Sequence, residues 1–321
     1  MTAPTASVAV ITYERPDFVA RCLDHLLVQT RAPLEIIVID SSAGDETSKL
    51  VGERYPMVRY QVCTAGSGAM ATARNISYRM ASGDVLAFID DDAFAEPEWL
   101  ENLLPHFDDP TVGAVGGRQI RRQPGELTEG VDAIGQLQHD GNLTGNFAAD
   151  PGRTVAVDHL LGANMSFRRS VLDQIGGIHD GYGGTCVREE TDLCLRVAHA
   201  GYRLVYTPEA VVEHVAAPYA KGQRFDLRYE YWAQKNHLIV LIRNFGASDP
   251  IILRYVWASI RRAVGDIATR TSKAGSRARA HDLGGAVRST GGAVLRASVV
   301  VAATGTGAGA GLQLAAADRR G

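Results

Sequence analysis

Short apolar runs alternate, over the first part of the chain, with segments whose apolar residues recur at helical spacing. Runs rich in β-branched residues predict buried strands at 8–13 and 36–40, and further strands at 58–62, 85–89 and 112–116. Helical spacing predicts helices between them, at 15–29, 45–55, 69–80 and 97–107. Strands and helices that alternate with short connections are typical of a mainly parallel sheet covered by helices on both faces.

The pattern weakens in the middle of the chain and then resumes. Residues 121–158 are polar, glycine-rich and without strong periodicity, so we expect a loop-rich excursion there. A strand, a helix and two closing strands are expected at 160–168, 191–200, 204–206 and 210–215. The predicted sheet therefore continues to about residue 215.

The character of the sequence changes past Gln223. Residues 225–245 and 251–267 have the spacing of amphipathic helices, whereas 272–288 is basic and glycine-rich and is expected to be mobile. Residues 297–317 contain no charge and are long enough to span a membrane, but their Ala and Gly content makes them weakly hydrophobic. Helix packing or a peripheral contact is therefore the preferred interpretation of this tail.

These patterns divide the chain into three predicted regions. The first is a sheet domain over 1–222, with one half at about 7–118 and the other at about 119–222. Amphipathic helices at 223–271 and a Gly/Ala-rich tail at 272–321 follow it. The length of 321 residues and the apolar fraction of 45% are sufficient for a sizeable core.

Charge and cysteine content argue against several classes of protein. The 33 basic and 36 acidic residues give a net charge of −3, without the basic surface that nucleic-acid binding requires, so no nucleic-acid partner is predicted. The four cysteines have no CxxC spacing, which argues against a disulfide framework and a cysteine zinc site. Residues 1–7 lack a basic region followed by an apolar core, so a cytoplasmic location without a secretory signal is expected.

Three adjacent carboxylates, Asp90, Asp91 and Asp92, follow the strand predicted at 85–89. Asp40 also ends a predicted strand, and ligands of such sheets bind beyond the carboxyl ends of the strands. Adjacent carboxylates repel one another, and a divalent cation such as Mg²⁺ or Mn²⁺, which prefers oxygen ligands, relieves the repulsion. The alternative is a solvated acidic turn, but the position after a buried strand favours a metal site.

Two further polar residues have both a structural and a functional interpretation. His214 ends a strand-like run, where a lone histidine is usually structural, although imidazole can complete an Asp-based Mn²⁺ site. Arg74 follows the turn at 66–68 and is either a surface residue or a charge partner for a diphosphate. The turn is not a Walker A loop, and no GxGxxG follows the first strand.

Glu189, Glu190 and Asp192 lie at the start of the helix expected at 191–200. Acidic residues in a first turn are favoured by the helix dipole, and Thr191 or Asp192 can cap the helix. The functional alternative is a general base that takes a proton from an acceptor hydroxyl. Both interpretations stay open from the residues alone.

Taken in order, these segments resemble glycosyltransferase family 2 over about residues 7–245. The segments that carry the resemblance are 10–15, 37–42, 73–75, 88–92, 161–168, 175–178, 189–196, 200–204 and 212–214. Each segment alone is weak, but the ordered set is specific. The resemblance implies a GT-A fold, with a nucleotide-binding half and an acceptor-binding half around a continuous Rossmann-like sheet, followed by a C-terminal helical extension.

The resemblance also implies roles for individual residues. Nucleotide binding would involve Thr12, Glu14, Asp40, Arg74, Asp90 and Asp91. The metal, Mn²⁺ or Mg²⁺, would be held by Asp92, His214 and Asp90. The donor sugar and the acceptor would face Gly162, Ala163 and Asn164.

The catalytic base is the point where this sequence departs from the family pattern. The family usually has Glu-Asp where this chain has Glu189 and Glu190. We interpret Glu190 as the base, with Asp192 and then Glu189 as alternatives. One displacement assisted by one base would invert the configuration at the sugar.

The implied activity is the transfer of a sugar from a nucleotide diphosphate donor, with UDP or dTDP favoured, to an acceptor hydroxyl. The acceptor would be a glycan, a lipid-linked glycan or a small molecule, in cell-wall, polysaccharide or natural-product glycosylation. A nucleotidyltransferase with an Asp–metal site and a non-catalytic nucleotide-sugar binding protein are the alternatives. The C-terminal helices are expected to contact the inner face of the membrane or a second copy of the chain.

Overall fold

The computed structural model describes residues 3–120, 133–184, 186–215, 226–279 and 283–319. The chain forms two compact units. The sheet unit comprises Met1–Leu137, Leu143–Asp180 and Glu189–Ala220, and the helical unit comprises Gln138–Asn142, Gly181–Arg188 and Lys221–Gly321. Two short stretches of the predicted first domain thus group with the C-terminal helices. Residues 121–132 of the predicted loop excursion lie outside the described residues.

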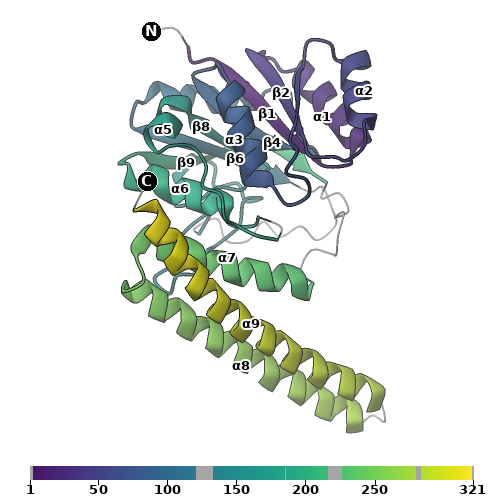
Figure 1. The fold of residues 1–321 in the computed structure, drawn as a ribbon, viewed down its shortest axis with the longest axis vertical. Helices are drawn as coiled ribbons and strands as arrows, with labels where there is room; N and C mark the ends of the chain where they lie inside the picture. The colour runs from purple at the N-terminus through teal and green to yellow at the C-terminus, as the bar shows by residue number, and fades with distance from the viewer. Residues whose placement is uncertain (1–2, 121–132, 185, 216–225, 280–282, 320–321) are drawn as a thin grey trace. The chain divides into compact units, whose positions relative to one another are not determined.

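A nine-stranded sheet forms the centre of the sheet unit (Figure 1). Its strands are β1 (Ala6–Thr12), β2 (Glu35–Asp40), β3 (Arg59–Val62), β4 (Val85–Asp90), β5 (Ala93–Ala95), β6 (Val112–Ile120), β7 (Val155–Ala156), β8 (Met165–Arg168) and β9 (Arg203–His214). The strand order is β3-β2-β1-β4-β8-β6-β9-β5, and β7 pairs with β9 beside this path.

The direction of the strands changes between the two halves of the sheet. Strand β1 pairs in parallel with β2 and β4, and β2 pairs in parallel with β3. Strand β8 then enters antiparallel between β4 and β6, and β9 runs parallel to β6. The predicted α/β class is confirmed, but the sheet is mixed and only its first half is wholly parallel. The apolar pattern of 160–168 could not reveal this, because a buried strand reads the same in either direction.

Helices cover both faces of the sheet, as the continuous apolar strands require. One apolar cluster includes residues of α1 (Pro16–Leu27), α2 (Glu46–Arg54), α4 (Trp99–Leu103) and the 3-10 helix Leu104–Asp108. The other includes residues of α3 (Met70–Met80), α5 (Arg169–Gln174) and α6 (Glu189–His199). In β1, Val8 and Val10 belong to the first cluster, whereas Ala9 and Ile11 belong to the second. Period-two alternation therefore supplies both layers of the core.

Some short elements are absent from the sequence-based prediction. Strands β5 and β7 and helix α5 have three, two and six residues, too few to give a clear period. The two predicted closing strands are one strand, β9. Pro208 and Glu209 interrupt the apolar pattern there, and the pairing of β9 with β6 shifts register between Thr207 and Val211. A bulge therefore replaces the expected break.

The helical unit contains three long helices, α7 (Leu227–Phe245), α8 (Pro250–Arg279) and α9 (Leu283–Asp318), of which α8 and α9 lie side by side (Figure 1). Residues 272–279 and 283–288, where we expect a mobile segment, lie within α8 and α9. Small residues allow α9 to approach α7 closely, because a Cβ on Gly307 would lie 2.9 Å from the Lys235 carbonyl oxygen. Close backbone approach thus offsets the low helix propensity of glycine.

Candidate active site

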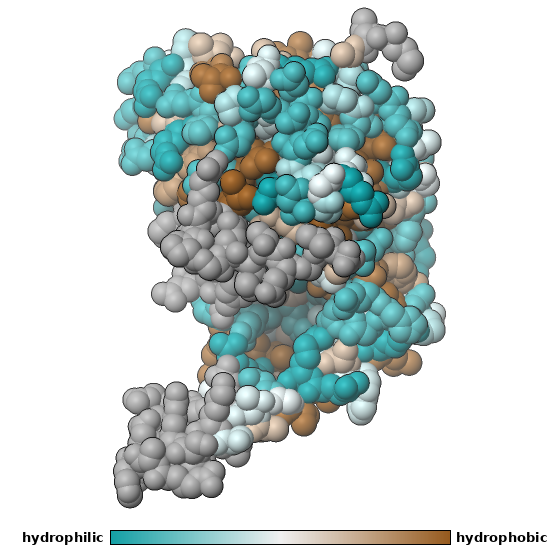
Figure 2. All heavy atoms as spheres, turned by 180° about the vertical axis from the view of Figure 1, so that it is seen from behind, coloured by the Kyte–Doolittle hydropathy of each residue, from teal (hydrophilic) through white to brown (hydrophobic). Residues whose placement is uncertain are grey.

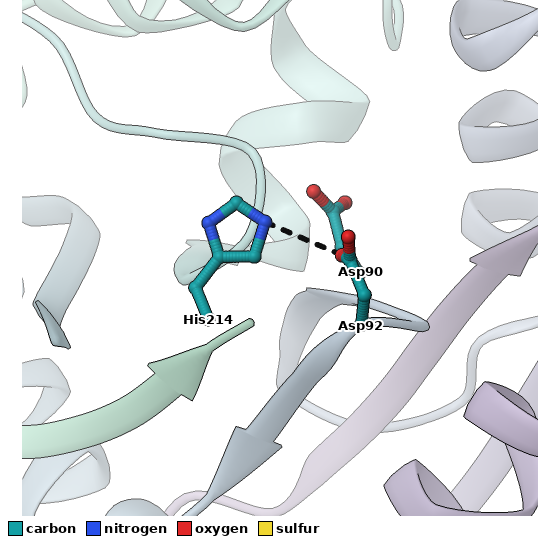
Figure 3. A group of neighbouring side chains, drawn as sticks. All are labelled: Asp90, Asp92 and His214. Carbon is teal, nitrogen blue, oxygen red and sulfur yellow. Dashed lines mark ion pairs between the residues drawn. The ribbon is translucent and has the colours of Figure 1, made fainter. Parts of the chain in front are cut away.

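A group with metal-ligand chemistry lies where strands β4, β5 and β9 end or begin (Figure 3). Asp90 ends β4, Asp92 follows in the turn to β5, and His214 ends β9. One ligand atom from each of these three residues lies within 4.8 Å of the others. Antiparallel pairing of β5 with β9 places Ala93 opposite His214, and the Val215 amide donates to the Asp92 carbonyl oxygen at 3.0 Å. The fold therefore brings together residues that are far apart in the sequence.

The three neighbouring aspartates have different surroundings. His214 Nε2 lies 3.3 Å from Asp92 Oδ1, and its ring points toward that carboxylate (Figure 3). Asp91 instead accepts a hydrogen bond from the Thr12 hydroxyl at 2.7 Å and one from Arg15 Nη1 at 3.0 Å. Arg15 Nη1 also lies 3.6 Å from Asp92 Oδ2. Asp90 and Asp92 thus share one site, while Asp91 fixes the strand end to β1 and α1.

Burial opposes the negative charge that these carboxylates carry. Burial raises the pKa of Asp90, and the nearby Asp92 carboxylate raises it further, against the opposing effect of Arg74. Burial likewise raises the pKa of Asp91 to about 7, although Arg15 opposes the shift. A divalent cation between Asp90 and Asp92 would remove the repulsion between them. The two carboxylates suit Mn²⁺ or Mg²⁺, and the imidazole is a ligand that Mn²⁺ also accepts.

Arg74, on helix α3, connects this group to the acidic start of helix α6. Arg74 is only 2% exposed, and its guanidinium forms an ion pair with Glu189. Arg74 Nη2 lies 3.6 Å from Asp90 Oδ1 and donates to the Gly162 carbonyl oxygen at 3.4 Å. A Cβ on Gly162 would lie 2.5 Å from Nη2, so a side chain there would displace the guanidinium. The arginine is therefore built into the site rather than lying on the surface.

The three candidate bases differ in accessibility. Glu189 is buried against Arg74, and Asp192 is buried with Oδ2 3.1 Å from His179 Nδ1. Glu190 is half-buried and is the most accessible of the three. Acidic side chains in the first turn of α6 also complement the helix dipole. Glu190 is therefore the only one of the three candidates that is not buried.

The predicted nucleotide-binding residues of β1 and β2 lie at the same edge of the sheet. Pairing aligns Thr12 with Asp40, and Ile11 with Asp90 on the other side of β1. The buried Asp40 accepts hydrogen bonds from the Ser42 amide at 2.8 Å and the Tyr60 hydroxyl at 2.7 Å.

Glu14 lies in the exposed loop after β1. Its backbone φ of 53° is in the left-handed region, and its amide donates to the Ser42 hydroxyl at 2.6 Å. A strained, non-glycine residue beside a ligand-binding edge is a feature of functional loops. The loops after β1 and β2 thus hold each other in place next to the carboxylates.

The predicted sugar-facing residues divide into two kinds. Gly162 is half-buried beside Arg74, whereas Ala163 and Asn164 are buried. Asn164 accepts from the Trp99 indole at 2.9 Å and donates to the Ala210 carbonyl at 3.0 Å. These bonds join β8, α4 and β9, which favours a structural role for Asn164.

Sequence reasoning singled out neither Arg15 nor His179. Arg15 contacts two of the three aspartates, and His179 contacts Asp192. Arg15 could have been expected near the aspartates, because the negative charge of three adjacent, partly buried carboxylates requires a compensating cation. No sequence signal identifies His179, since only the fold brings residue 179 to helix α6.

Comparison with known proteins agrees with the resemblance seen in the sequence. The family model described as "Glycosyl transferase family 2" matches residues 7–176, more than half of the chain. The glucosyl-dolichyl phosphate glucuronosyltransferase of Haloferax volcanii is 28% identical over 229 residues, which cover 65% of this chain and 68% of that protein. The pre-mycofactocin glycosyltransferase of Mycobacterium tuberculosis is 32% identical over 197 residues, 59% of this chain but 39% of that protein.

The fold is similar to that of solved glycosyltransferases. A mannosyltransferase from Pyrobaculum calidifontis, solved with GDP-Man and Mn²⁺, superposes with a TM-score of 0.60 at 21% identity, covering 97% of this chain and 88% of that one. This likeness supports the expected GT-A architecture.

Proposed function

The chain belongs to glycosyltransferase family 2, and from that premise we propose that it is a metal-dependent, inverting enzyme using nucleotide diphosphate sugar donors. The observation that carries the proposal is the convergence of Asp90, Asp92 and His214 at the carboxyl ends of the strands. An acidic surface turn would require no histidine from β9 and no buried arginine beside it. The competing interpretation of a solvated turn is therefore disfavoured.

In this proposal Asp92, Asp90 and His214 hold a divalent cation, Mn²⁺ or Mg²⁺. When bound, that cation supplies Lewis-acid stabilisation of the charge that builds on the leaving diphosphate. Arg74 lies 3.6 Å from Asp90 and forms an ion pair with Glu189. It would therefore fix the proposed metal ligands relative to the start of α6, which carries the proposed base.

Nucleotide binding is proposed for the loops after β1 and β2, with Thr12, Glu14 and Asp40, and for Arg74, Asp90 and Asp91. Thr12 and Asp91 bind each other, so their contribution to the pocket is its shape more than free hydrogen-bonding groups. Gly162 and Ala163 are proposed to border the donor sugar. For Asn164, the hydrogen bonds to Trp99 and Ala210 support a role in holding that border.

Glu190 is the proposed general base. It would accept the proton of the acceptor hydroxyl as that oxygen attacks the anomeric carbon from the face opposite the diphosphate. A single displacement of this kind inverts the anomeric configuration. Asp192 would orient the start of α6 together with His179, and Glu189 would fix it through Arg74.

The donor base and the acceptor are proposed at the level of class. UDP or dTDP sugars are favoured donors, and the acceptor is a glycan, a lipid-linked glycan or a small molecule. The glucosyl-dolichyl phosphate in the name of the Haloferax volcanii relative supports the lipid-linked class. A cytoplasmic location, with contact to the inner face of the membrane or to a second copy, completes the proposal.

The proposal is tested by incubating the full chain with a panel of nucleotide sugars and Mn²⁺ and measuring nucleoside diphosphate release. We expect release from one donor class, its loss with EDTA, and its restoration by Mn²⁺. Donor and Mn²⁺ together should raise the melting temperature, because both bind the folded state. Glu190→Gln should keep donor-dependent stabilisation but lower nucleoside diphosphate release by about 10²–10⁴-fold.

Each competing function predicts a different outcome. A nucleotidyltransferase would release inorganic diphosphate from a nucleoside triphosphate. A non-catalytic binding protein would bind a donor without turnover, and Glu190→Gln would change nothing. Stabilisation by donor in the complete absence of product would favour this last alternative and contradict the proposed activity.

A further inference from the structure

Helix α8 has two apolar faces, and only one of them is packed. Ile251, Ile252 and Tyr255 are buried within the helical unit. A second set of large apolar residues is 43–75% exposed: Leu253, Trp257, Ile260 and Val264. At 100° per residue, their spacing of four, three and four places them in one row, on the side of α8 opposite the buried residues.

The exposed row is unusual for a water-facing helix. Single exposed apolar residues are common on soluble proteins, but a row over three turns that includes tryptophan indicates an interaction surface. In the view of Figure 2 hydrophilic side chains cover most of the surface and hydrophobic ones form small separate patches. The row on α8 therefore calls for a partner that accepts apolar side chains along about 16 Å of helix.

The charge around this row identifies the chemistry of the partner. Residues 250–270, which contain the row, have four Arg against one Asp, a net charge of +3, whereas the whole chain carries −3. Arg261 is exposed and directly follows Ile260 of the row. A basic segment on an acidic protein is complementary to an anionic surface.

We propose that the exposed face of α8 docks in the plane of a bilayer surface that contains anionic lipid headgroups. Leu253, Ile260 and Val264 would enter the boundary of the acyl chains, and Trp257 would lie at headgroup level, where its amphipathic ring is favoured. Arginine side chains can extend to lipid phosphates while their aliphatic stems stay among apolar groups. The inference deepens the proposed function and rests on it, because the membrane contact would bring the proposed enzyme to acceptors that are held in the membrane.

A membrane-spanning arrangement fits the structure less well. Within the described residues, Val294–Asp318 of α9 is long and apolar enough to span a bilayer. However, α9 packs through small residues on α7, where Cβ atoms on Gly307 and Gly311 would lie 2.9–3.0 Å from atoms of Lys235 and Ile242. Asp318 also forms an ion pair with Arg243 of α7 at 2.7 Å. These contacts hold one face of α9 against α7 within the helical unit.

A second copy of the chain is the other occupant to consider. A two-fold contact through the same face would bring two net-positive segments together. Like charge opposes that arrangement and favours an anionic lipid surface. A dimer through α8 is therefore an outcome that the experiment must be able to detect.

The test is sedimentation of the full chain with vesicles of phosphatidylcholine alone or of equal parts phosphatidylcholine and phosphatidylglycerol. We expect binding to the anionic vesicles that weakens at high salt and is released by carbonate. The double variant Leu253→Glu, Trp257→Glu should reduce the bound fraction at least about tenfold, because two charges would enter the apolar boundary. Its matched control is Leu34→Glu, Met57→Glu, which changes two exposed apolar residues of the sheet unit and should bind as wild type.

Tryptophan fluorescence gives a second readout that is specific to α8. Trp99 is buried and Trp232 packs against Gly183, whereas Trp257 is exposed. Anionic vesicles should therefore shift the emission of Trp257 to shorter wavelength. Trp257→Phe should abolish this shift while most vesicle binding persists. If the charged double variant loses its circular dichroism spectrum, Trp257→Ser replaces it in the same assay.

Three results would overturn the inference. The first is the same vesicle binding in wild type and the charged variant, and the second is no preference for anionic lipid. The third is a wild-type dimer in light scattering that the charged variant converts to monomer without any vesicle binding. Nucleoside diphosphate release in vesicle-free solution is measured in parallel, so loss of enzyme activity with intact vesicle binding would contradict only the proposed function.

Discussion

At the amino-terminal end of β2, the Glu35 carboxylate accepts hydrogen bonds from the Ser7 hydroxyl and the Ser82 amide at 2.6 and 2.7 Å. At the carboxyl-terminal end of β4, Asp90 and Asp92 instead face each other and a histidine. The two groups lie at opposite ends of the same parallel strands. At one end of the sheet, hydrogen-bond donors stabilise the charge of Glu35. At the other end, several carboxylates lie close together, and the donors around them do not offset their negative charge.

The pKa values express the same contrast. Burial alone raises the pKa of Glu35, but hydrogen bonds from Ser7 and Ser82 lower it to about 2. Burial raises the pKa of Asp91 to about 7 at the other end. The ionised form of Glu35 therefore stabilises the fold, whereas the ionised aspartate group costs stability that a bound cation would return. Stability and function are separated along the length of the strands.

Removing one carboxylate from each end of the sheet should give the largest difference between the two ends. Asp92→Asn should lower sugar transfer by about 10³-fold or more, because the proposed cation loses a ligand and the leaving diphosphate loses its charge stabilisation. Its melting temperature should stay the same or rise, since repulsion between Asp90 and Asp92 is relieved. Steady-state kinetics with Mn²⁺ and thermal unfolding without it measure the two effects.

Glu35→Gln is the matched control at the opposite end. It should lower the melting temperature while the folded enzyme keeps its turnover number. If Asp92→Asn lowered stability as much as Glu35→Gln and retained activity, the two ends would not differ in role. The same variants in the presence of Mn²⁺ should separate further, because only the chain with an intact Asp92 gains stability from the metal.

The arginine at each end gives the next largest contrast. Arg74→Met should cost about 3–5 kcal/mol in the free energy of unfolding, because it leaves the buried Glu189 and the half-buried Asp90 without their cation. Arg59→Met, which removes the partly exposed partner of Glu35, should cost about 1 kcal/mol or less. Urea unfolding of both variants measures the difference.

A double variant distinguishes pairing from packing at Arg74. Adding Glu189→Leu to Arg74→Met should recover part of the lost free energy of unfolding. The double variant removes both charges of the ion pair, so neither is left buried without its partner. Equal costs for Arg74→Met and Arg59→Met would contradict a buried ion pair at the active end. Additive costs in the double variant would show that Arg74 stabilises by its contact with Gly162 and the apolar groups around it.

The sequence was sufficient for much of this picture, for identifiable reasons. Short apolar runs in β1, β2 and β4 predicted the parallel half of the sheet, and the position of Asp40 and Asp90 after such runs predicted a ligand-binding edge there. The direction of β8 could not be predicted, because an apolar strand carries no signal of orientation. The short strand β5, which aligns His214 with the turn of Asp92, is below the length at which periodicity is informative.

Roles of single polar residues were harder to predict than the location of the site. Glu189 and Glu190 are adjacent and chemically identical, yet one is buried against Arg74 and the other is half-buried. Asn164 lies in a family-like segment, but its amide joins β8 to α4 and β9. Such assignments depend on tertiary contacts between segments about 45 to 115 residues apart, which local sequence pattern does not encode.

The smallest expected effect is the acid dependence of stability at the amino-terminal end. The folded pKa of Glu35 is about 2, below the value of about 4.3 in an unfolded chain. Ionised Glu35 therefore contributes stability above the unfolded pKa, and this contribution is lost as the pH falls from about 5 to about 2. After allowance for solvent screening we expect about 1–2 kcal/mol. Wild type should lose that much more unfolding free energy than Glu35→Gln between pH 7 and pH 2.5, measured by urea unfolding with EDTA present.

Because the comparison is between two chains with the same aspartates at the other end, titration of Asp90, Asp91 and Asp92 cancels in the difference. Parallel pH profiles for the two proteins would mean that Ser7 and Ser82 do not favour the ionised carboxylate, and the contrast between the ends of the sheet would then rest on the metal site alone.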